Sequence, residues 1–213
     1  MKYKLLFFSL LVSNFCFGQY DVDKGAKIIG GKIGYNRTNT NNFDYTSLNT
    51  SHEISPFIAY FPQDRLAIGL HIIFSGTTEK RTNLVNAVPN NWNETQQQMV
   101  GLSPFIRYYI PIGPKLYFYG QFNAYNGFGT SETNFSNPSF GNSGKLDIRQ
   151  FGIAVIPGFS FAATNRLNIE GSINMLNYNR YKFYLGDTLI QKYDNANFGF
   201  GDISPTVGIS VNF

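Results

Sequence analysis

Bulky apolar residues alternate with small or polar residues along several segments of the chain. The final segment, "TVGISVNF" from Thr206 to Phe213, alternates at every position. A period of two is the pattern of a β-strand whose two faces meet different surroundings. We therefore expect an all-β fold. Eight strands are predicted, at residues 26–36, 52–61, 65–75, 97–110, 115–126, 147–161, 166–178 and 200–213.

These strands are predicted to form hairpins joined by long polar stretches. Three short turns, "FPQDR", "IPIGPK" and "AATNR", follow strands that carry Pro56, Pro104 and Pro157, and Pro205 occupies the same place in the last strand. The long stretches are rich in Asn, Thr, Ser and Gly, and we expect them to be loops at 36–51, 75–95, 126–145 and 179–199. Because proline has no N–H for a ladder, we expect a bulge or kink at the height of the prolines.

The volume of the side chains indicates which face of the strands points inward. The interior of an eight-stranded barrel is only just wide enough for its own side chains. Bulky aliphatic and aromatic residues would overfill it, whereas Gly, Ser, Ala, Asn and a few charges would not. We therefore expect the polar face inside and the apolar face against lipid, in an eight-stranded antiparallel up-and-down transmembrane β-barrel. A soluble secreted β-sandwich is the alternative, and it would bury the apolar face.

Strands of the type "SPxxxYx", the short turns, the Asn-rich stretches and the terminal aromatic resemble the outer membrane β-barrel domain family of Gram-negative bacteria. The build is similar to small barrels of the OmpA and OmpX type, a porin-like architecture, and the resemblance covers about residues 20–213. It implies outer-membrane lipid and the barrel-assembly machinery as partners. It also implies that the last strand carries an assembly signal, with Gly208, Val211 and Phe213 in the expected kinds of position.

The first residues indicate export. Lys2 and Lys4 precede an apolar run from Leu5 to Val12, and Gly18 is a small residue suited to cleavage. This pattern predicts a cleaved signal peptide at residues 1–18, which leaves a barrel domain at 19–213. Together with the resemblance, export implies that the protein is in the outer membrane. Cys16, the single cysteine, would leave with the signal, which excludes disulfides and cysteine-based sites from the mature chain.

Charge and composition argue against several classes of function. Only 14% of residues are charged, and loss of Lys2 and Lys4 would lower the formal charge from +4 to +2. The basic residues are scattered, so we predict no nucleic-acid partner. His52 and His71 are the only histidines, and neither lies in a motif with a nucleophile or other ligands. We therefore predict no enzyme activity, no metal and no cofactor.

Two sets of residues are predicted to matter for the barrel. The first is an interior polar network, formed by Lys32, Glu53, His71, Arg107, Gln121, Gln150, Glu170 and Asp202. Opposite charges buried together must pair, so these residues are expected to plug the lumen. The second is a pair of aromatic girdles at the two membrane interfaces, formed by Tyr35, Tyr60, Phe74, Tyr108, Phe161 and Phe213.

The function most consistent with these features is a structural or surface-interaction role, in which the barrel anchors loops that contact an extracellular or envelope protein. A narrow channel or transporter for small or hydrophobic solutes is an alternative, although eight strands leave little room for water. A lipid-modifying enzyme of the outer membrane is a third possibility.

Overall fold

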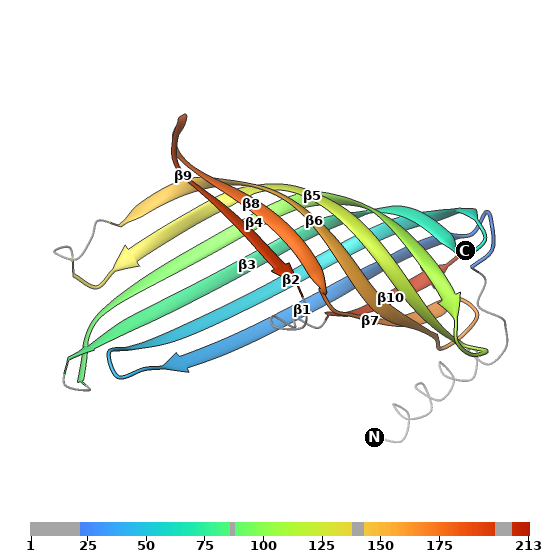
Figure 1. The fold of residues 1–213 in the computed structure, drawn as a ribbon, viewed down its shortest axis with the longest axis horizontal. Helices are drawn as coiled ribbons and strands as arrows, with labels where there is room; N and C mark the ends of the chain where they lie inside the picture. The colour runs from blue at the N-terminus through green and yellow to red at the C-terminus, as the bar shows by residue number, and fades with distance from the viewer. Residues whose placement is uncertain (1–21, 86–87, 138–142, 199–205) are drawn as a thin grey trace, which may run out of the picture.

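The computed structural model describes residues 22–85, 88–137, 143–198 and 206–213. These residues form strands, turns and bends (Figure 1). The ten strands are β1 (Lys27–Asn41), β2 (Tyr45–Gln63), β3 (Leu66–Val85), β4 (Val88–Pro111), β5 (Leu116–Phe135), β6 (Gly144–Ala162), β7 (Leu167–Ser172), β8 (Leu176–Leu185), β9 (Thr188–Phe198) and β10 (Thr206–Asn212).

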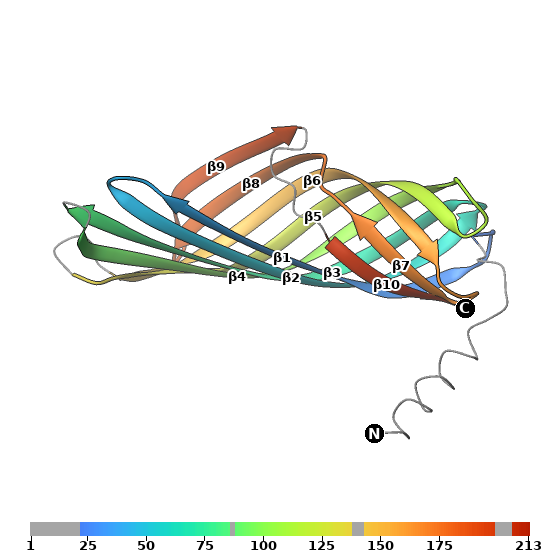
Figure 2. The same cartoon turned by 90° about the horizontal axis from the view of Figure 1, so that it is seen from below.

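Eight of these strands close into a ring. The strands β1 to β7 pair in chain order, each with the next. The ring closes because β7 also pairs with β10, and β10 pairs with β1. Every pair is antiparallel. The strands β8 and β9 continue the wall beyond this ring, because β8 follows β7 and pairs with the outer part of β6. Figure 2 shows the closed end of the barrel beside both described termini and the hairpin of β8 and β9 at the other end. The prediction of an eight-stranded antiparallel barrel is confirmed.

The register of the ladders sets the tilt of the strands. One continuous row of paired residues starts at Phe159 in β6, travels once around the barrel and returns to β6 at Arg149, ten residues away. The residues between these ends are Gly171, Val207, Ile33, Ile54, Phe74, Val100 and Phe128. A stagger of this size over eight strands tilts them by roughly 40° from the barrel axis, so each residue advances about 2.5 Å along it.

The strands are longer than the sequence predicted. β2 to β6 have 19 to 24 residues each, whereas about ten tilted residues cross the apolar core of a bilayer. Most of the stretches predicted to be loops are therefore strands that continue the hairpins past the membrane. The alternation fades there because water wets both faces of the sheet, so no apolar face marks the strand.

The faces of the strands lie as the side-chain volumes predicted. Apolar residues such as Ile68, Ile106 and Ile209 point outward and are about half exposed, while Ser160 and Ser210 point inward and are fully buried. This outward apolar surface is the one that acyl chains would cover. The barrel hides its polar face and displays its apolar one.

The interior also contains large rings that the volume argument did not include. Phe57, Phe105 and Tyr119 point inward and are at most 4% exposed. Each is paired directly with a glycine of the neighbouring strand, in the pairs Gly30–Phe57, Gly69–Phe105 and Tyr119–Gly158. A Cβ atom at any of these glycines would collide with the ring opposite. Because glycine has no side chain, each ring occupies the space opposite it, and the lumen is not overfilled.

The prolines interrupt pairing on one side only. Pro56, Pro104 and Pro157 each pair with a residue of the preceding strand and with none of the following strand. On that second side, the carbonyl of Pro157 still accepts a hydrogen bond from Ile173 N at 3.2 Å. At Pro157 the opposite strand also gains one residue, between Ser172 and Leu176, which is a bulge. The expected bulge is thus present at Pro157, whereas at Pro56 and Pro104 the register is unchanged. Pro205 lies outside the described residues.

Candidate functional site

Aromatic rings fill the lumen at the end with the short turns. Phe61 comes from the end of β2, Tyr109 from the end of β4, and Tyr117 and Tyr119 from the start of β5. The ring centroids of Phe61 and Tyr109 lie 5.7 Å apart, and those of Tyr109 and Tyr119 also lie 5.7 Å apart. Phe61, Tyr109 and Tyr119 have no exposed surface. This layer, which we call the aromatic floor, closes the turn-side end of the barrel.

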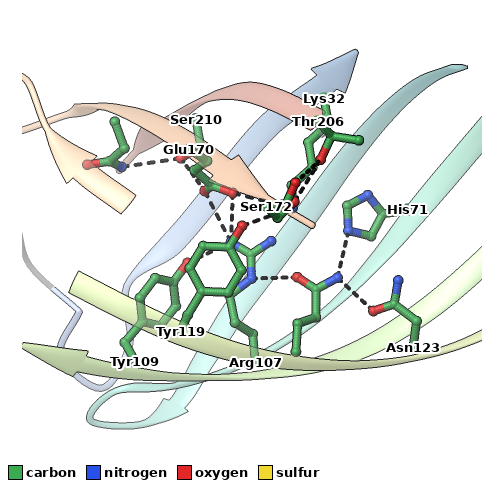
Figure 3. Close-up of polar contacts among 12 residues, drawn as sticks. Lys32, His71, Arg107, Tyr109, Tyr119, Asn123, Glu170, Ser172, Thr206 and Ser210 are labelled. Carbon is green, nitrogen blue, oxygen red and sulfur yellow. Dashed lines mark hydrogen bonds and ion pairs between the residues drawn. The ribbon is translucent and has the colours of Figure 1, made fainter. Parts of the chain in front are cut away.

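An ion cluster lies directly above the floor and joins opposite walls of the barrel (Figure 3). Arg107 of β4 donates through Nη1 to both carboxylate oxygens of Glu170 on β7, at 3.1 and 3.0 Å. Lys32 of β1 approaches the same carboxylate at 3.8 Å. The side chains of Arg107 and Glu170 are each 1% exposed, and that of Lys32 is 6% exposed. Three charges are therefore buried together, as a carboxylate shared by two cations.

Hydroxyl groups are further partners of these charges, although Arg107 Nη2 is buried without a hydrogen-bond partner among the described residues. Arg107 Nη1 donates to the hydroxyl of Tyr109 at 2.8 Å, and Lys32 Nζ donates to the hydroxyl of Tyr119 at 3.1 Å. Ser210 of β10 donates to Glu170 Oε1 at 3.0 Å. The guanidinium of Arg107 also lies over the ring of Tyr119, 4.3 Å from its centroid. Because each buried charge has polar partners, the desolvation cost of the cluster is offset in part.

A chain of amides links the ion cluster to a histidine. Arg107 Nε donates to Gln121 Oε1 at 2.6 Å, and Gln121 Nε2 donates to Asn123 Oδ1 at 2.6 Å. The same Nε2 atom lies 3.4 Å from His71 Nε2. The ring of His71 packs against Phe57 and Phe105, with centroids 5.0 and 4.7 Å away. We call the ion cluster and this amide chain together the plug.

The lumen widens into a polar cup on the far side of the plug. Two adjoining cavities, of about 260 and 330 Å³, share Glu53, Asn123 and Asn174 among their lining residues. Lys32, His71 and Gln121 of the plug line the first cavity. Gln150 and Tyr181 line the second, where Gln150 donates to the hydroxyl of Tyr181 at 3.0 Å. The cup thus lies between the plug and the long hairpins.

The structure brings together five of the eight residues predicted for the interior network. Lys32, His71, Arg107, Gln121 and Glu170 form the plug. Glu53 and Gln150 also point inward, but they line the cup on the far side of the plug. Asp202 lies outside the described residues.

Tyr109, Tyr119 and Ser210 belong to the same assembly and were missed from sequence. The signal was present in part: Tyr119 and Gln121 are two residues apart in one strand, as are Arg107 and Tyr109, so they share a face. No role was predicted for either tyrosine, because only charged, amide and imidazole side chains were considered for the network.

The predicted girdle residues all point outward, and the predicted assembly residues lie in the last strand and directly after it. Tyr35, Tyr60, Phe74, Tyr108, Phe161 and Phe213 are 47–64% exposed. Gly208 is buried on the inner face and Val211 is 43% exposed on the outer face. The backbone of Phe213 exchanges hydrogen bonds with that of Lys27, at 3.1 and 3.2 Å. The girdle and assembly roles themselves stay predictions.

The two histidines lie on opposite faces of the wall. His71 points into the lumen, whereas the ring of His52 covers Gly76, its partner across the ladder to β3, on the outer face. In the part of the chain that the structure describes, no three His, Cys, Asp or Glu side chains are grouped so that they could hold a metal ion. Across the same residues, no helix has the length and apolar character that crossing a membrane would require.

Comparison with solved structures identifies the architecture. The outer membrane protein OprG from Pseudomonas aeruginosa aligns with a TM-score of 0.50 and 12% identity, over 92% of this chain and 98% of that chain. The fold is that of an outer-membrane β-barrel. Neisserial surface protein A aligns over 89% of this chain and 98% of its own, with 12% identity and a TM-score of 0.46. A major outer membrane protein from Thermus thermophilus aligns over 88% of this chain and 99% of its own, with 11% identity and a TM-score of 0.46.

Comparisons by sequence give no family. No family model matches the chain, and no curated protein matches it. At 12% identity, the structural likeness to OprG establishes the fold alone. The function has to be argued from the site.

Proposed function

We propose that this protein is an integral outer-membrane protein whose closed barrel anchors stiff extracellular β-hairpins for contact with partners at the cell surface. The observation that carries the proposal is the plug, which joins opposite walls of the barrel. Lys32 and Glu170 come from β1 and β7, and Arg107 and Gln121 come from β4 and β5.

The plug and the floor argue against the alternative of a channel. A conducting path needs a water-filled passage, but Arg107, Tyr109, Tyr119, Gln121 and Glu170 are each at most 2% exposed. Opening a path would separate Arg107 from Glu170 and leave buried charges without partners, which is costly. The two cavities of the cup include plug residues on one side and do not include the floor residues Phe61 and Tyr109.

The hairpins that project beyond the bilayer supply the surface for contact. Phe43, between β1 and β2, is 94% exposed, and Leu185 and Ile190, beside the turn of β8 and β9, are 60% and 54% exposed. Leu185 and Ile190 belong to β8 and β9, and Phe43 lies in the short turn between two paired strands, so the strands hold all three close to fixed positions. Such groups suit recognition of an extracellular or envelope protein, because little order is lost on binding.

Planar-bilayer recording tests the closed lumen. We expect the refolded wild-type barrel to show no steady conductance. The double variant Arg107→Ala, Glu170→Ala removes the ion pair that joins the walls and should show frequent openings. A steady open channel in the wild type would overturn the closed-barrel proposal and favour passage of solutes.

Cysteine labelling tests the orientation. The barrel domain contains no cysteine, since Cys16 is the only one in the chain. We would place one cysteine at Asp187, in the turn between β8 and β9, and in a second variant at Gly113, between β4 and β5. A membrane-impermeant maleimide should label Asp187→Cys on intact cells and Gly113→Cys only after the outer membrane is permeabilised. The opposite pattern would contradict the proposal.

A further inference from the structure

A long groove crosses the outer wall of the barrel. It has a volume of about 760 Å³ and runs over β2, β3, β4, β5 and β6. Its edge nearer the short turns is a row of paired apolar residues that ends in one cation. The row is Ile54, Phe74, Val100, Phe128 and Arg149. The opposite edge is polar and includes His52, Gln98 and Thr130. The groove is therefore amphipathic across its width, and its end on β6 carries Arg149 on the apolar edge and Asp147 on the polar edge.

Two more cations extend the row beyond Arg149. Arg149 pairs directly with Lys182 of β8, and Lys182 pairs directly with Lys192 of β9. Directly paired residues share one face of a sheet, with Cβ atoms roughly 5 Å apart, and like charges at this distance destabilise the pairing. We call Arg149, Lys182 and Lys192 the basic row.

The basic row is only partly neutralised by the protein. Lys192 lies 3.6 Å from Asp194, but that carboxylate is already bound by Arg180 at 2.8 Å. The hydrogen bond from Arg180 holds the pKa of the Asp194 carboxyl below its ordinary value. In the described part of the chain, no carboxylate lies within 4.0 Å of the cationic nitrogens of Arg149 or Lys182, although Asp147 shares their face. The guanidinium of Arg149 rests on the ring of Tyr184, 4.8 Å from its centroid.

The height of these groups matches the boundary of a bilayer. Arg149 is twelve residues from Phe161 along β6, which corresponds to about 30 Å along the barrel axis at about 2.5 Å per residue. The apolar band of an outer-membrane barrel is about 25 Å tall. Because the strands are tilted, the row of paired residues climbs by about 3 Å per strand, so the apolar edge rises through the upper acyl region from Ile54 to Arg149. The basic row continues this climb above the acyl region.

We propose that the groove and the basic row bind a phosphorylated lipid of the outer leaflet, with its acyl chains along Ile54, Phe74, Val100 and Phe128 and its phosphates on Arg149, Lys182 and Lys192. This inference rests on the outer-membrane location proposed above. Cations alone would accept any anion. The apolar row leading up to them selects an anion that is attached to hydrocarbon. The row of like charges is destabilising by itself, and phosphate would relieve the repulsion.

Native mass spectrometry of the refolded barrel in detergent, titrated with bisphosphorylated lipid A, tests this site. Dephosphorylated lipid A and inorganic phosphate are the two reference probes. The variant Arg149→Gln, Lys182→Gln, Lys192→Gln removes the basic row. The matched control Arg37→Gln, Lys80→Gln, Arg81→Gln removes the same charge from other hairpins. A further variant, Phe128→Ser, changes only the apolar edge.

We expect bisphosphorylated lipid A to bind wild type more tightly than either reference probe. Removal of the basic row should weaken that binding on the order of 100-fold, at about fivefold per lost cation. The affinity of the control variant for this lipid should stay within threefold of wild type. Phe128→Ser should weaken binding of the phosphorylated and the dephosphorylated lipid alike. Equal binding of the two lipids, equal binding of inorganic phosphate, or an equal loss in the control would overturn the lipid site.

Heat-modifiable migration on gels and insertion into vesicles separate this failure from failure of the proposed function. If the barrel folds and inserts but does not distinguish the lipids, only the proposal of a lipid site is overturned. A chain that does not insert into vesicles overturns both proposals.

Discussion

Replacing Glu170 by glutamine tests whether the plug stabilises the barrel as an ion cluster. The carboxylate lies 3.0 Å from Arg107 and 3.8 Å from Lys32. At an effective dielectric constant of about 20, these distances correspond to attractions of about 5.5 and about 4.4 kcal/mol. Most of this gain offsets the desolvation of the charges. Removing one partner nevertheless leaves two buried cations without a carboxylate, for which about 3–5 kcal/mol is the usual loss.

The assay is equilibrium unfolding by urea in phospholipid vesicles, followed by far-ultraviolet circular dichroism and by the gel shift of the folded barrel. We expect Glu170→Gln to lower the free energy of unfolding by about 3–5 kcal/mol. The exposed residue Glu132 of β5 is the control, and Glu132→Gln should change it by less than about 0.5 kcal/mol. A loss below about 1 kcal/mol for Glu170→Gln, or no coupling to Arg107→Gln in a double-mutant cycle, would refute the cluster as a source of stability.

Three further predictions follow from the wall and the last strand. Gly158→Val should cost about 1–3 kcal/mol in the same unfolding assay, because its Cβ would meet the ring of Tyr119, whereas Gly171→Val faces open space and should be tolerated; equal losses would contradict the ring-over-glycine packing. Ile209→Lys, on the outer face, should lower the free energy of unfolding by about 2–4 kcal/mol if the apolar face meets lipid. Thr38→Lys, beyond the bilayer, should change it little. The reverse order would contradict the assignment of faces. Deleting Phe213 should lower the amount of folded barrel in cells more than it lowers refolding in vitro, and equal effects on both would contradict an assembly signal in the last strand.

Much of the barrel could be predicted from sequence because one face of each membrane strand must be apolar. The alternation at Thr206–Phe213 predicted the strand, and the volume of the side chains predicted its orientation. The exposed Ile209 beside the buried Ser210 confirms the orientation. Beyond the bilayer this constraint ends. The residues Tyr45–Ser51 and Gly76–Val85 are strands without an apolar face, so the pattern that identifies strands disappears while the hydrogen bonding continues.

The plug was predictable in kind but not in its contacts. Buried opposite charges had to meet, and Arg107, Glu170 and Lys32 do. Which residues meet depends on the stagger of the whole barrel, because Arg107 and Glu170 come from opposite walls and are 63 residues apart. The stagger is the sum of the registers of all the strand pairs around the ring. The sequence pattern of a single strand does not determine it. The same reason hid the basic row, whose three members become neighbours only through the pairing of β6, β8 and β9.

The continuation of the strands past the bilayer has a mechanical consequence. The outer parts of β3 and β4 remain paired as far as Val85 and Val88, so force applied at that end is borne by many backbone hydrogen bonds in shear. If an adhesin or phage pulled on such a hairpin, the force would reach the membrane-embedded barrel almost at once, because paired strands extend very little under tension. A guest peptide grafted at this end would be held at a nearly constant distance from the lipid surface.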